Sequence, residues 1–371
     1  AGWRAGVIGT IGVRLADEQR PAVLTTPESP ELFGLLREMV ERGVQAVAIE
    51  VSSHALVQRR AFGLACEVAV FTNLSHDHLD YHGTMERYLD AKLMLFDGRN
   101  LDRAPGAWTA WTAVVDADDP AAARVVAAAR RGGGEVASFG EAEGARYRIA
   151  ALAPRERGLS FELRHDGART PIALPLLGRH NAWNAAGAFA AARALGIAPE
   201  TAASGLAAML VVPGRLERVE AGQPFLVVVD YAHTPDALQR ALAAAREHGG
   251  RRVLLVFGCG GGRDRAKRPA MGRVAAEGCD RAWVTSDNPR GEDPAAIAAD
   301  IRAGVPGGAL ALELDRRAAI VAAITAARAG DVVLIAGKGH ETTQTIGARV
   351  LPFDDRAVAR EALRALAAGR P

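Results

Sequence analysis

The sequence predicts an α/β protein built from two parallel-sheet domains, and three observations lead to this prediction. Short apolar runs of the β type alternate with longer helical stretches, as in parallel sheets whose strands are joined by crossover helices. The alternation stops at the Pro-Gly pair within 211–215 and then restarts. The length of 371 residues corresponds to two or three domains, at about 150 residues each.

The expected strands are apolar runs that end in polar or glycine-rich residues: 46–51, 68–72, 113–116, 225–230, 252–258, 281–285 and 331–336. Helices are expected where strong helix formers dominate: 31–43, 84–96, 181–195, 236–248, 316–328 and 357–368. The stretch 146–175 alternates apolar and polar residues and contains the turn signal His165-Asp166-Gly167. It is therefore predicted to be an antiparallel hairpin inserted in the first domain.

The domain boundary is placed at the Pro-Gly pair, so that the first domain covers 1–213 and the second covers 214–371. The chain opens at Ala1 and runs almost at once into the apolar segment 5–10, which is typical of a domain interior. We therefore expect an N-terminally truncated chain.

The composition is that of an ordinary globular protein, with 49% hydrophobic and 24% charged residues. The net charge of +2 gives no reason to expect a nucleic-acid or membrane partner. Three scattered cysteines (Cys66, Cys259 and Cys279) do not form a disulfide framework or a Cys-type zinc site. No apolar run approaches the roughly 18 residues of a membrane span, and a cytoplasmic location is expected.

Polar clusters follow the predicted strands in both domains, which suggests one ligand cleft between them, since ligands of open parallel sheets bind beyond the carboxyl ends of the strands. One cluster is rich in carboxylate and imidazole groups: Glu50, His76, Asp77, His78, Asp80 and His82. It matches no zinc pattern, but it could serve acid–base chemistry or hold Mg²⁺, which takes few protein ligands. The alternative is a polar loop whose histidines cap a helix.

Two further clusters lie in the second domain. The glycine run 258–262 is followed by Arg263 and could bind an anion, although a tight strand-to-helix turn explains it equally well. In the segment 287–290, Pro289 stiffens a turn from which Arg290 could hold a carboxylate, the alternative being an exposed surface turn. The Gly337-Lys338-Gly339 segment lacks the spacing of a Walker loop.

Taken together, these segments resemble the Mur ligases, and within that family the branch that adds meso-diaminopimelate. The matching segments occur in the family's order along essentially the whole chain: 25–28, 50–54, 73–83, 91–92, 178–184, 214–217, 230–235, 258–264, 287–290 and 337–341. The resemblance implies an incomplete central ATPase-type domain followed by a Rossmann-like C-terminal domain. It also implies a monomeric, cytoplasmic enzyme.

The reaction implied by the resemblance is the ATP-dependent joining of meso-diaminopimelate to UDP-MurNAc-L-Ala-D-Glu through an acyl phosphate. Phosphoryl transfer between two anions needs cations and positioning more than covalent chemistry. The resemblance accordingly implies Mg²⁺ bound by Glu50 and His78, and a lysine, Lys92, that CO₂ converts to a carbamate able to ligate the metal. Without the resemblance, Lys92 would be an ordinary exposed helix lysine.

The resemblance also assigns the remaining binding residues. The UDP-MurNAc-dipeptide side comprises Thr25, Thr26, Ser52, Gln58 and Arg60. The nucleotide side comprises Asn181, Asn184, Arg215 and Asp230, with His180 a doubtful neighbour. The incoming amino acid is assigned to Arg263, Asp287, Asn288, Pro289, Arg290, Gly337 and Glu341. Arg290 would pair with the distal carboxylate of diaminopimelate and Glu341 with its distal ammonium.

The family's P-loop is expected just upstream of segment 5–10 and is absent from the sequence. As written, the chain is therefore expected to bind ATP poorly and to be inactive. Two alternatives stay open. One is another substrate within the family or its relatives, either a lysine-adding Mur ligase or a folylpolyglutamate-type enzyme; the other is a catalytically dead chain that acts as a binding module.

Overall fold

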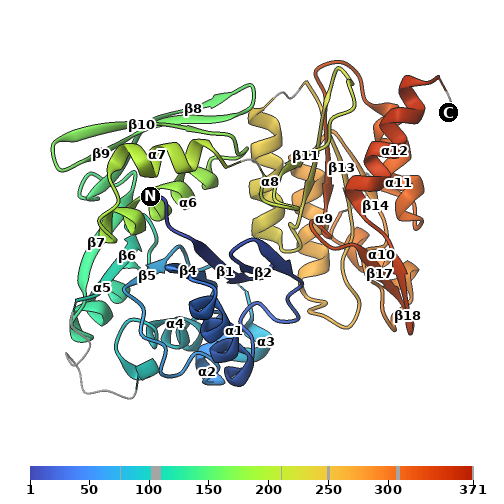
Figure 1. Ribbon diagram of the computed structural model, residues 1–371. Helices are drawn as coiled ribbons and strands as arrows, with labels where there is room; N and C mark the ends of the chain where they lie inside the picture. The colour runs from blue at the N-terminus through green and yellow to red at the C-terminus, as the bar shows by residue number, and fades with distance from the viewer. Residues whose placement is uncertain (76, 102–109, 210, 249–250, 306–309, 370–371) are drawn as a thin grey trace. The chain divides into compact units, whose positions relative to one another are not determined.

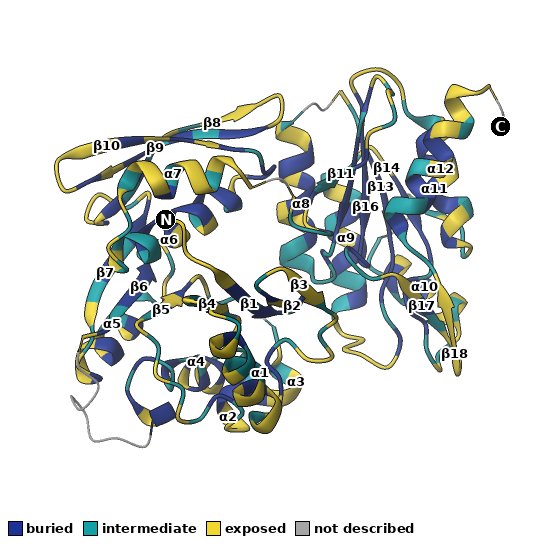
Figure 2. Ribbon diagram, viewed as in Figure 1, coloured by how far each residue is buried: buried dark blue, intermediate teal, exposed yellow. Residues whose placement is uncertain are grey.

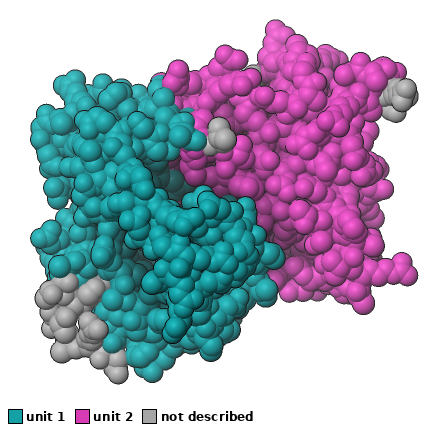
Figure 3. All heavy atoms as spheres, viewed as in Figure 1, with its two compact units in different colours: residues 1–152, 160–174, 182–208 teal, residues 153–159, 175–181, 209–371 magenta. Residues whose placement is uncertain are grey.

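The computed structural model describes residues 1–75, 77–101, 110–209, 211–248, 251–305 and 310–369. These residues form two compact units, which Figure 3 shows in different colours. The first unit covers 1–152, 160–174 and 182–208, and the second covers 153–159, 175–181 and 209–371. Each unit has its own buried core, as the dark strands in Figure 2 show.

The first unit begins with a four-stranded sheet in the order β3 (Glu18–Arg20), β2 (Gly12–Leu15), β1 (Ala5–Gly9) and β4 (Ala46–Ile49). The pair β1–β4 is parallel, whereas β1–β2 and β2–β3 are antiparallel. Helix α1 (Ser29–Glu41) buries Leu32 and Met39 in the same apolar cluster as Ile8 of β1. This packing holds the carboxyl ends of β1 and β4 next to each other.

The second sheet of this unit has the order β10-β9-β8-β7-β6-β5. Strands β5 (Val68–Phe71), β6 (Thr112–Asp116), β7 (Glu135–Gly140) and β8 (Tyr147–Arg155) are mutually parallel. Helices α4 (Met85–Leu93) and α5 (Ala122–Arg131) pack their apolar side chains against β5 and β6. The shorter elements of the first unit are α2 (Ser53–Val57), α3 (Leu79–His82), a 3₁₀ turn (Arg99–Leu101) and α7 (Pro199–Ala207), while α6 (His180–Ala194) crosses from the second unit into the first.

The second unit contains a six-stranded sheet covered by helices on both faces (Figure 1). Its order is β11 (Glu217–Arg218), β12 (Leu226–Asp230), β16 (Val332–Ala336), β13 (Val253–Phe257), β14 (Arg281–Val284) and β15 (Leu310–Leu312). All neighbouring pairs from β12 to β15 are parallel, and β11 is antiparallel. A two-stranded hairpin, β17 (Thr343–Ile346) and β18 (Arg349–Pro352), follows the last parallel strand.

Successive side chains of each strand point to opposite faces of this sheet, so the two faces belong to different apolar clusters. Helices α8 (Pro235–Glu247), α9 (Lys267–Gly278) and α10 (Pro294–Arg302) share one apolar cluster with one face. Helices α11 (Arg316–Ala326) and α12 (Asp355–Ala367) share another cluster with the opposite face. Val228 belongs to the first cluster and Val227 and Val229 to the second, as the period of two requires.

The predicted α/β class is confirmed, and every strand and helix expected from the sequence is present within a few residues of its predicted position. The segment expected to be one hairpin instead forms three strands, β8, β9 (Gly158–His165) and β10 (Ala168–Leu174), which extend the parallel sheet. The predicted turn is correct, because Asp166 and Gly167 both have positive φ, at 47° and 77°. The antiparallel strands β2 and β3 were not predicted, because they are short and carry little apolar pattern.

Candidate functional site

A pocket of about 350 Å³ lies in the first unit, where β4 and β5 end. Its polar lining comes from the residues that follow the two strands and from one lysine of α4: Thr25, Glu50, Ser52, Thr72, Asn73 and Lys92. Apolar side chains from the same segments complete the wall, among them Phe71 and Phe96. The expectation that polar clusters at strand ends meet in space therefore holds within this unit.

Glu50 is held at the edge of the pocket by Thr10, the first residue after β1. One carboxylate oxygen, Oε2, accepts hydrogen bonds from the Thr10 backbone N–H at 2.6 Å and from its hydroxyl at 2.7 Å. The Thr10 hydroxyl also lies 3.0 Å from that of Thr25. A side chain at Gly9 would collide with Glu50, since its Cβ would lie 2.8 Å from Oε2. The carboxylate is thus fixed by chain segments far apart in sequence.

Lys92 lies on the last turn of α4 with its ammonium 5.0 Å from the centre of the Tyr88 ring. Burial lowers the pKa of Lys92 below its ordinary value, although the carboxylates of Asp77 and Asp119 oppose the shift. A lowered pKa increases the fraction of neutral amine at neutral pH. Lys92 therefore holds more neutral amine at neutral pH than an exposed lysine does, contrary to the simple interpretation of this residue as a surface helix side chain.

His78 lies near Tyr88, the residue that Lys92 also contacts. The centre of its ring is 5.8 Å from that of Tyr88 and 4.9 Å from that of His54. Its backbone is left-handed, with φ of 55°, a conformation that is uncommon outside glycine and often found at functional positions. Desolvation and the neighbouring His78 ring lower the pKa of His54. His82 is buried and its Nε2 lies 2.9 Å from the Ser53 hydroxyl, so it braces the histidine loop against α2.

The Glu50 carboxylate offers the oxygen ligand that Mg²⁺ prefers and the His78 imidazole could be a further ligand, whereas Lys92 would offer an oxygen only as a carbamate. Lys92 connects the other two, because it shares the pocket lining with Glu50 and the Tyr88 ring with His78. Among the described residues, no group of three or more His, Cys, Asp or Glu side chains could hold a metal ion. Mg²⁺ keeps several waters and needs only one or two protein carboxylates, so a sparse donor set suits it better than Zn²⁺. His76, part of the predicted cluster, lies outside the described residues.

The residues assigned to the UDP-MurNAc-dipeptide form one connected group at the start of α2. The buried Thr26 hydroxyl donates to the Glu50 carbonyl at 2.8 Å and accepts from the Ser52 N–H at 3.0 Å. Thr26 therefore fixes the backbone of this loop, whereas Thr25 faces the pocket.

Ser52 caps α2, because its hydroxyl accepts the Ala55 N–H at 3.1 Å. Arg60 donates to the Thr26 carbonyl at 3.1 Å, to the side chain of Gln58, and pairs with Glu28 at 3.0 Å. Arg60 thus links Gln58 to the loop that carries Thr26.

In the second unit, the loop after β14 meets the loop after β16. The Asn288 amide nitrogen donates to Oε2 of Glu341 at 2.7 Å, and its oxygen accepts the Thr345 N–H at 2.9 Å. The Gln344 side chain donates to the Asp287 carbonyl at 2.8 Å. The two segments that the sequence assigned to the incoming amino acid are therefore joined by side-chain hydrogen bonds.

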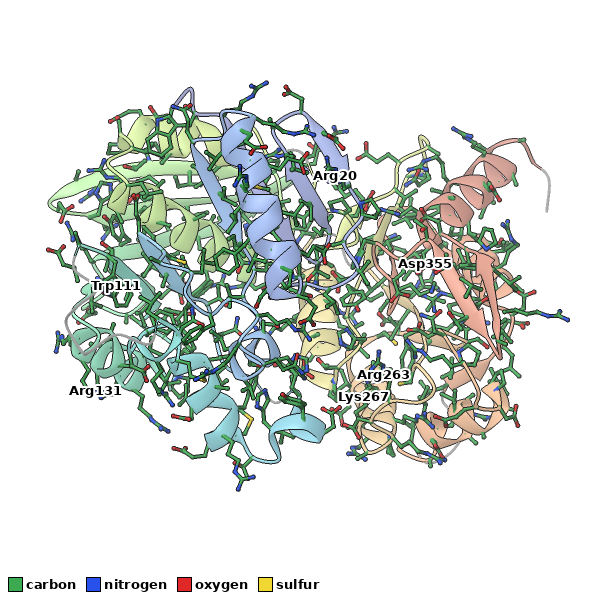
Figure 4. The ribbon with its side chains drawn as sticks, turned by 60° about the horizontal axis from the view of Figure 1, so that its bottom comes forward. Arg20, Trp111, Arg131, Arg263, Lys267 and Asp355 are labelled. Atoms are coloured by element: carbon green, nitrogen blue, oxygen red, sulfur yellow. The ribbon has the colours of Figure 1, made fainter. Side chains whose placement is uncertain are left out.

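Arg290 extends from this loop over the glycine run after β13. Its Nη1 donates to the Gly261 carbonyl at 2.8 Å and lies 2.9 Å from the position that a Cβ on Gly260 would occupy. Its φ is 53°, and its N–H donates to the Thr345 carbonyl at 3.0 Å. The alternative of a loose surface turn is not supported, because both backbone and side chain of Arg290 are held. Arg263, on the loop before α9, is exposed (Figure 4).

Asp287 and Gly337 form a close contact beneath this loop. A Cβ at Gly337, whose φ is +117°, would lie 2.7 Å from Oδ2 of Asp287, so only glycine fits. Burial raises the pKa of Asp287, with the cations of Arg316 and Lys338 opposing the shift. Pro289, two residues after Asp287, is also buried and stiffens the turn. Asp287 is thus part of a buried ionic group under the loops.

The residues assigned to the nucleotide lie on α6 and around β12. Asn181 and Asn184 are three residues apart on α6 and so share a face of the helix. Both carboxylate oxygens of Asp230 accept backbone N–H groups, from Leu216 and Ala232, each at 2.8 Å. The Arg215 guanidinium lies 4.9 Å from the Tyr231 ring centre. Asp230 therefore shapes the loop that presents Arg215.

His180, at the start of α6, gives a testable pH effect. Burial and then the guanidinium groups of Arg240 and Arg215 lower its pKa from 6.5 to about 4, so the unfolded chain binds more protons between these values. The stabilisation is complete above pH 6.5 and is lost as the pH falls toward 4. Urea unfolding should give a lower free energy at about pH 5 than at about pH 7, and His180→Gln should reduce this decrease. If the free energy of unfolding decreased equally in both proteins between pH 7 and pH 5, the pH effect would not come from His180.

The sites include further residues that the sequence did not assign, among them Thr10, Thr72, Asn73 and Lys338. Thr10 directly follows β1 and Asn73 is the second residue after β5, so the rule about strand ends could have found them. Lys338 lies between two glycines in the 337–341 segment that resembles the Mur ligases, but the resemblance gives the lysine no role. Its burial and its contacts depend on residues about fifty positions away, such as Asn288.

Comparison with known proteins identifies the family of the chain. Residues 2–192 match the Mur ligase middle domain, and residues 214–339 match the Mur ligase glutamate ligase domain. The chain is 47% identical over 366 residues to the UDP-N-acetylmuramoyl-L-alanyl-D-glutamate--2,6-diaminopimelate ligase of Solibacter usitatus, covering 98% of this chain and 72% of the relative. It is 46% identical to the enzyme of the same name from Geobacillus thermodenitrificans, covering 98% and 74% of the two chains.

A solved structure of a UDP-N-acetylmuramoyl-L-alanyl-D-glutamate--2,6-diaminopimelate ligase superimposes with a TM-score of 0.69 at 36% identity, over 98% of this chain and 73% of that one. Folylpolyglutamate synthase from Mycobacterium tuberculosis, at 21% identity and a TM-score of 0.67, covering 93% of this chain and 73% of that one, shares the fold. These matches define the class of the protein as an ATP-dependent ligase that forms amide bonds. The chain belongs to the Mur ligase family.

Proposed function

We propose that the full-length protein catalyses the ATP-dependent addition of meso-diaminopimelate to UDP-MurNAc-L-Ala-D-Glu in peptidoglycan precursor synthesis. The observation that carries the proposal is the 47% identity, along 98% of the chain, to a ligase whose name states this reaction. The buried lysine in the pocket of the first unit and the joined loops of the second unit support it. We place the functional boundary between the ATP-binding and amino-acid-binding domains at 213/214.

In the first unit, Glu50, His78 and Lys92 would hold Mg²⁺, which when bound neutralises charge on ATP and on the acceptor carboxylate. The lone pair of the neutral Lys92 amine forms an N–C bond to CO₂ and the nitrogen releases a proton, which leaves an anionic carbamate. The lowered pKa of Lys92 supports this step, because only the neutral amine reacts. Thr25, Thr26, Ser52, Gln58 and Arg60 would bind the UDP-MurNAc-dipeptide.

The γ-carboxylate of the dipeptide's D-glutamate attacks the terminal phosphorus of ATP, giving an acyl phosphate and ADP. The amine of meso-diaminopimelate then attacks the acyl carbon, and the tetrahedral intermediate expels phosphate and a proton. In the second unit, Arg263, Asp287, Asn288, Pro289, Arg290, Gly337 and Glu341 would bind the amino acid. The nucleotide side would comprise Asn181, Arg215 and Asp230 of the second unit and Asn184 of the first. Among the described residues no helix is long and apolar enough to cross a membrane. We further propose that the enzyme acts as a monomer in the cytoplasm.

The function is tested by measuring phosphate release from ATP with the full-length protein, UDP-MurNAc-L-Ala-D-Glu and either meso-diaminopimelate or lysine. We expect release only when all three substrates are present, and with meso-diaminopimelate rather than lysine. Equal rates with lysine would indicate a lysine-adding enzyme. A folded chain that binds the substrates and releases no phosphate would favour the binding-module alternative.

Arg290→Ala should weaken the use of meso-diaminopimelate far more than that of ATP. The variant removes the guanidinium that would pair with the distal carboxylate, a charge-assisted contact, so KM for diaminopimelate should rise roughly tenfold to a hundredfold. Arg317→Ala, which removes an exposed cation of α11 paired with Glu361, is the matched control and should change neither KM. Equal losses toward ATP and diaminopimelate would refute the specificity role of Arg290.

A further inference from the structure

Lys338 is a fully buried lysine in the loop after β16, where it contacts the loop after β14. It is not among the residues assigned to the substrates. Its ammonium donates to Oε2 of Glu341 at 3.0 Å, to Oδ1 of Asn288 at 3.3 Å and to the Thr343 carbonyl at 2.6 Å. An ammonium has three N–H donors, so each donor has one acceptor. The three acceptors come from the loop after β14, the loop after β16 and the first residue of β17.

The ion pair is asymmetric in its exposure. The Lys338 side chain is 0% exposed, whereas that of Glu341 is 31% exposed. The cation therefore lies beneath the loop, and the carboxylate reaches from it toward the surface. Within the described residues, both side-chain hydrogen bonds that reach the Glu341 carboxylate end on Oε2. The other oxygen, Oε1, is thus left to accept from a ligand.

Lys338 also fixes the orientation of the Asn288 amide. The amide oxygen accepts from both Lys338 and the Thr345 N–H, so the amide nitrogen must point to Glu341. A flipped amide would place a donor against two donors. Two side chains assigned to the incoming amino acid, Asn288 and Glu341, are therefore oriented by one buried cation.

We infer that Lys338 is a positioning residue for amino-acid specificity, which holds Oε2 of Glu341 and the Asn288 amide so that Oε1 of Glu341 receives the distal ammonium of a diamino acid. This inference rests on the proposed function, because it deepens the role of the same amino-acid site. Lys338 does not touch the substrate; its ammonium acts through Glu341. The ammonium of Lys338 also pairs with the Glu341 carboxylate, which would otherwise be a partly buried charge without a counter-charge.

The test is the equilibrium binding of meso-diaminopimelate to the purified chain, measured by titration calorimetry for Lys338→Met and for the unaltered protein. Lys338→Met keeps an unbranched apolar side chain up to Cε and removes the Nζ atom with its charge and three donors. We expect its Kd to rise roughly tenfold to a hundredfold, the range for a lost hydrogen bond to a charged group. Arg252→Met is the matched control. It also removes a cation from a buried carboxylate, that of Asp331 at the other end of the same sheet, and should leave Kd unchanged.

A double-mutant cycle with Glu341→Gln separates a positioning role from a general loss of structure. If Lys338 acts through the Glu341 carboxylate, the double variant should bind no more weakly than Glu341→Gln alone. The double variant also contains no unpaired buried charge, so it serves as the test if Lys338→Met does not fold. Additive losses, or an unchanged Kd in folded Lys338→Met, would overturn the inference and leave the proposed function intact. Failure of the unaltered chain to bind diaminopimelate would instead overturn the amino-acid site and the inference together.

Discussion

Replacing Lys92 by alanine is expected to lower the rate of phosphate release by roughly a hundredfold to a thousandfold, the effect of removing one electrostatic group from a phosphoryl-transfer site. The reason is that Lys92 would supply, as its carbamate, an anionic oxygen beside Glu50 in the pocket. Lys92 enters the pocket from α4, whereas Glu50 enters it from the end of β4. Glu50 therefore cannot take over the place of the missing Lys92 side chain. The measurement is steady-state phosphate release at saturating substrates.

Chemical rescue makes this prediction specific to the carbamate. Lys92→Ala leaves a gap in which a short carboxylate, such as acetate or propionate, could supply the missing anionic oxygen, so millimolar carboxylate should restore part of the rate. Arg87→Ala removes an exposed cation from the same helix and should retain the full rate. If Lys92→Ala were as active as Arg87→Ala, the proposed role of Lys92 would be wrong. If it were inactive and resisted rescue, a role for the amine itself would be favoured over the carbamate.

Replacing Asp355 by alanine is expected to lower the free energy of unfolding of the second unit by about 3–5 kcal/mol. Asp355 begins α12 and is labelled in Figure 4. Both of its oxygens accept from Arg316 of α11 at 2.7 Å, and both side chains are 0% exposed. Removal of the carboxylate would leave a buried guanidinium without its counter-charge. Urea unfolding at neutral pH measures the loss.

The same two helices provide the control for this prediction. Glu361→Ala breaks the exposed pair between α12 and Arg317 of α11 and should cost less than about 1 kcal/mol. The double variant Arg316→Met/Asp355→Leu removes both buried charges and should recover most of the loss of Asp355→Ala. A loss in Asp355→Ala no greater than that in Glu361→Ala would show that the buried pair contributes little to stability.

The Arg316–Asp355 pair also illustrates what sequence reasoning could not find. Arg316 donates to the carbonyl of Ala336 at 3.0 Å, the last residue of β16, so the pair fixes the point where the 337–341 loop begins. Nothing in the local pattern around either residue distinguishes it from the surface charges that flank it. The pair forms only because α11 and α12 pack side by side on one face of the sheet.

The candidate residues of the pocket also differ in how far the sequence alone could indicate them. Glu50 and Asn73 could be proposed from their places after strands, since that rule needs only the apolar pattern and the polar residue that ends it. Lys92 could be proposed only from the resemblance to the Mur ligases, because a lysine on an amphipathic helix is ordinarily exposed. Its burial beside Tyr88, and the resulting fall in its pKa, arise from the packing of α4 against the strand ends.

The sequence by itself determined the α/β class, the order of the strands and helices along the chain and the polar segments that follow the strands. Those properties follow from local patterns of apolar residues and turn formers, which act over a few residues. The tertiary structure decided which of those segments meet, that Thr26 and Asp230 serve the backbone while Lys92 and Lys338 are buried, and that β8–β10 extend a parallel sheet. Burial and pairing depend on groups brought together across the fold, because the energy of a charge is set by all of its neighbours in space.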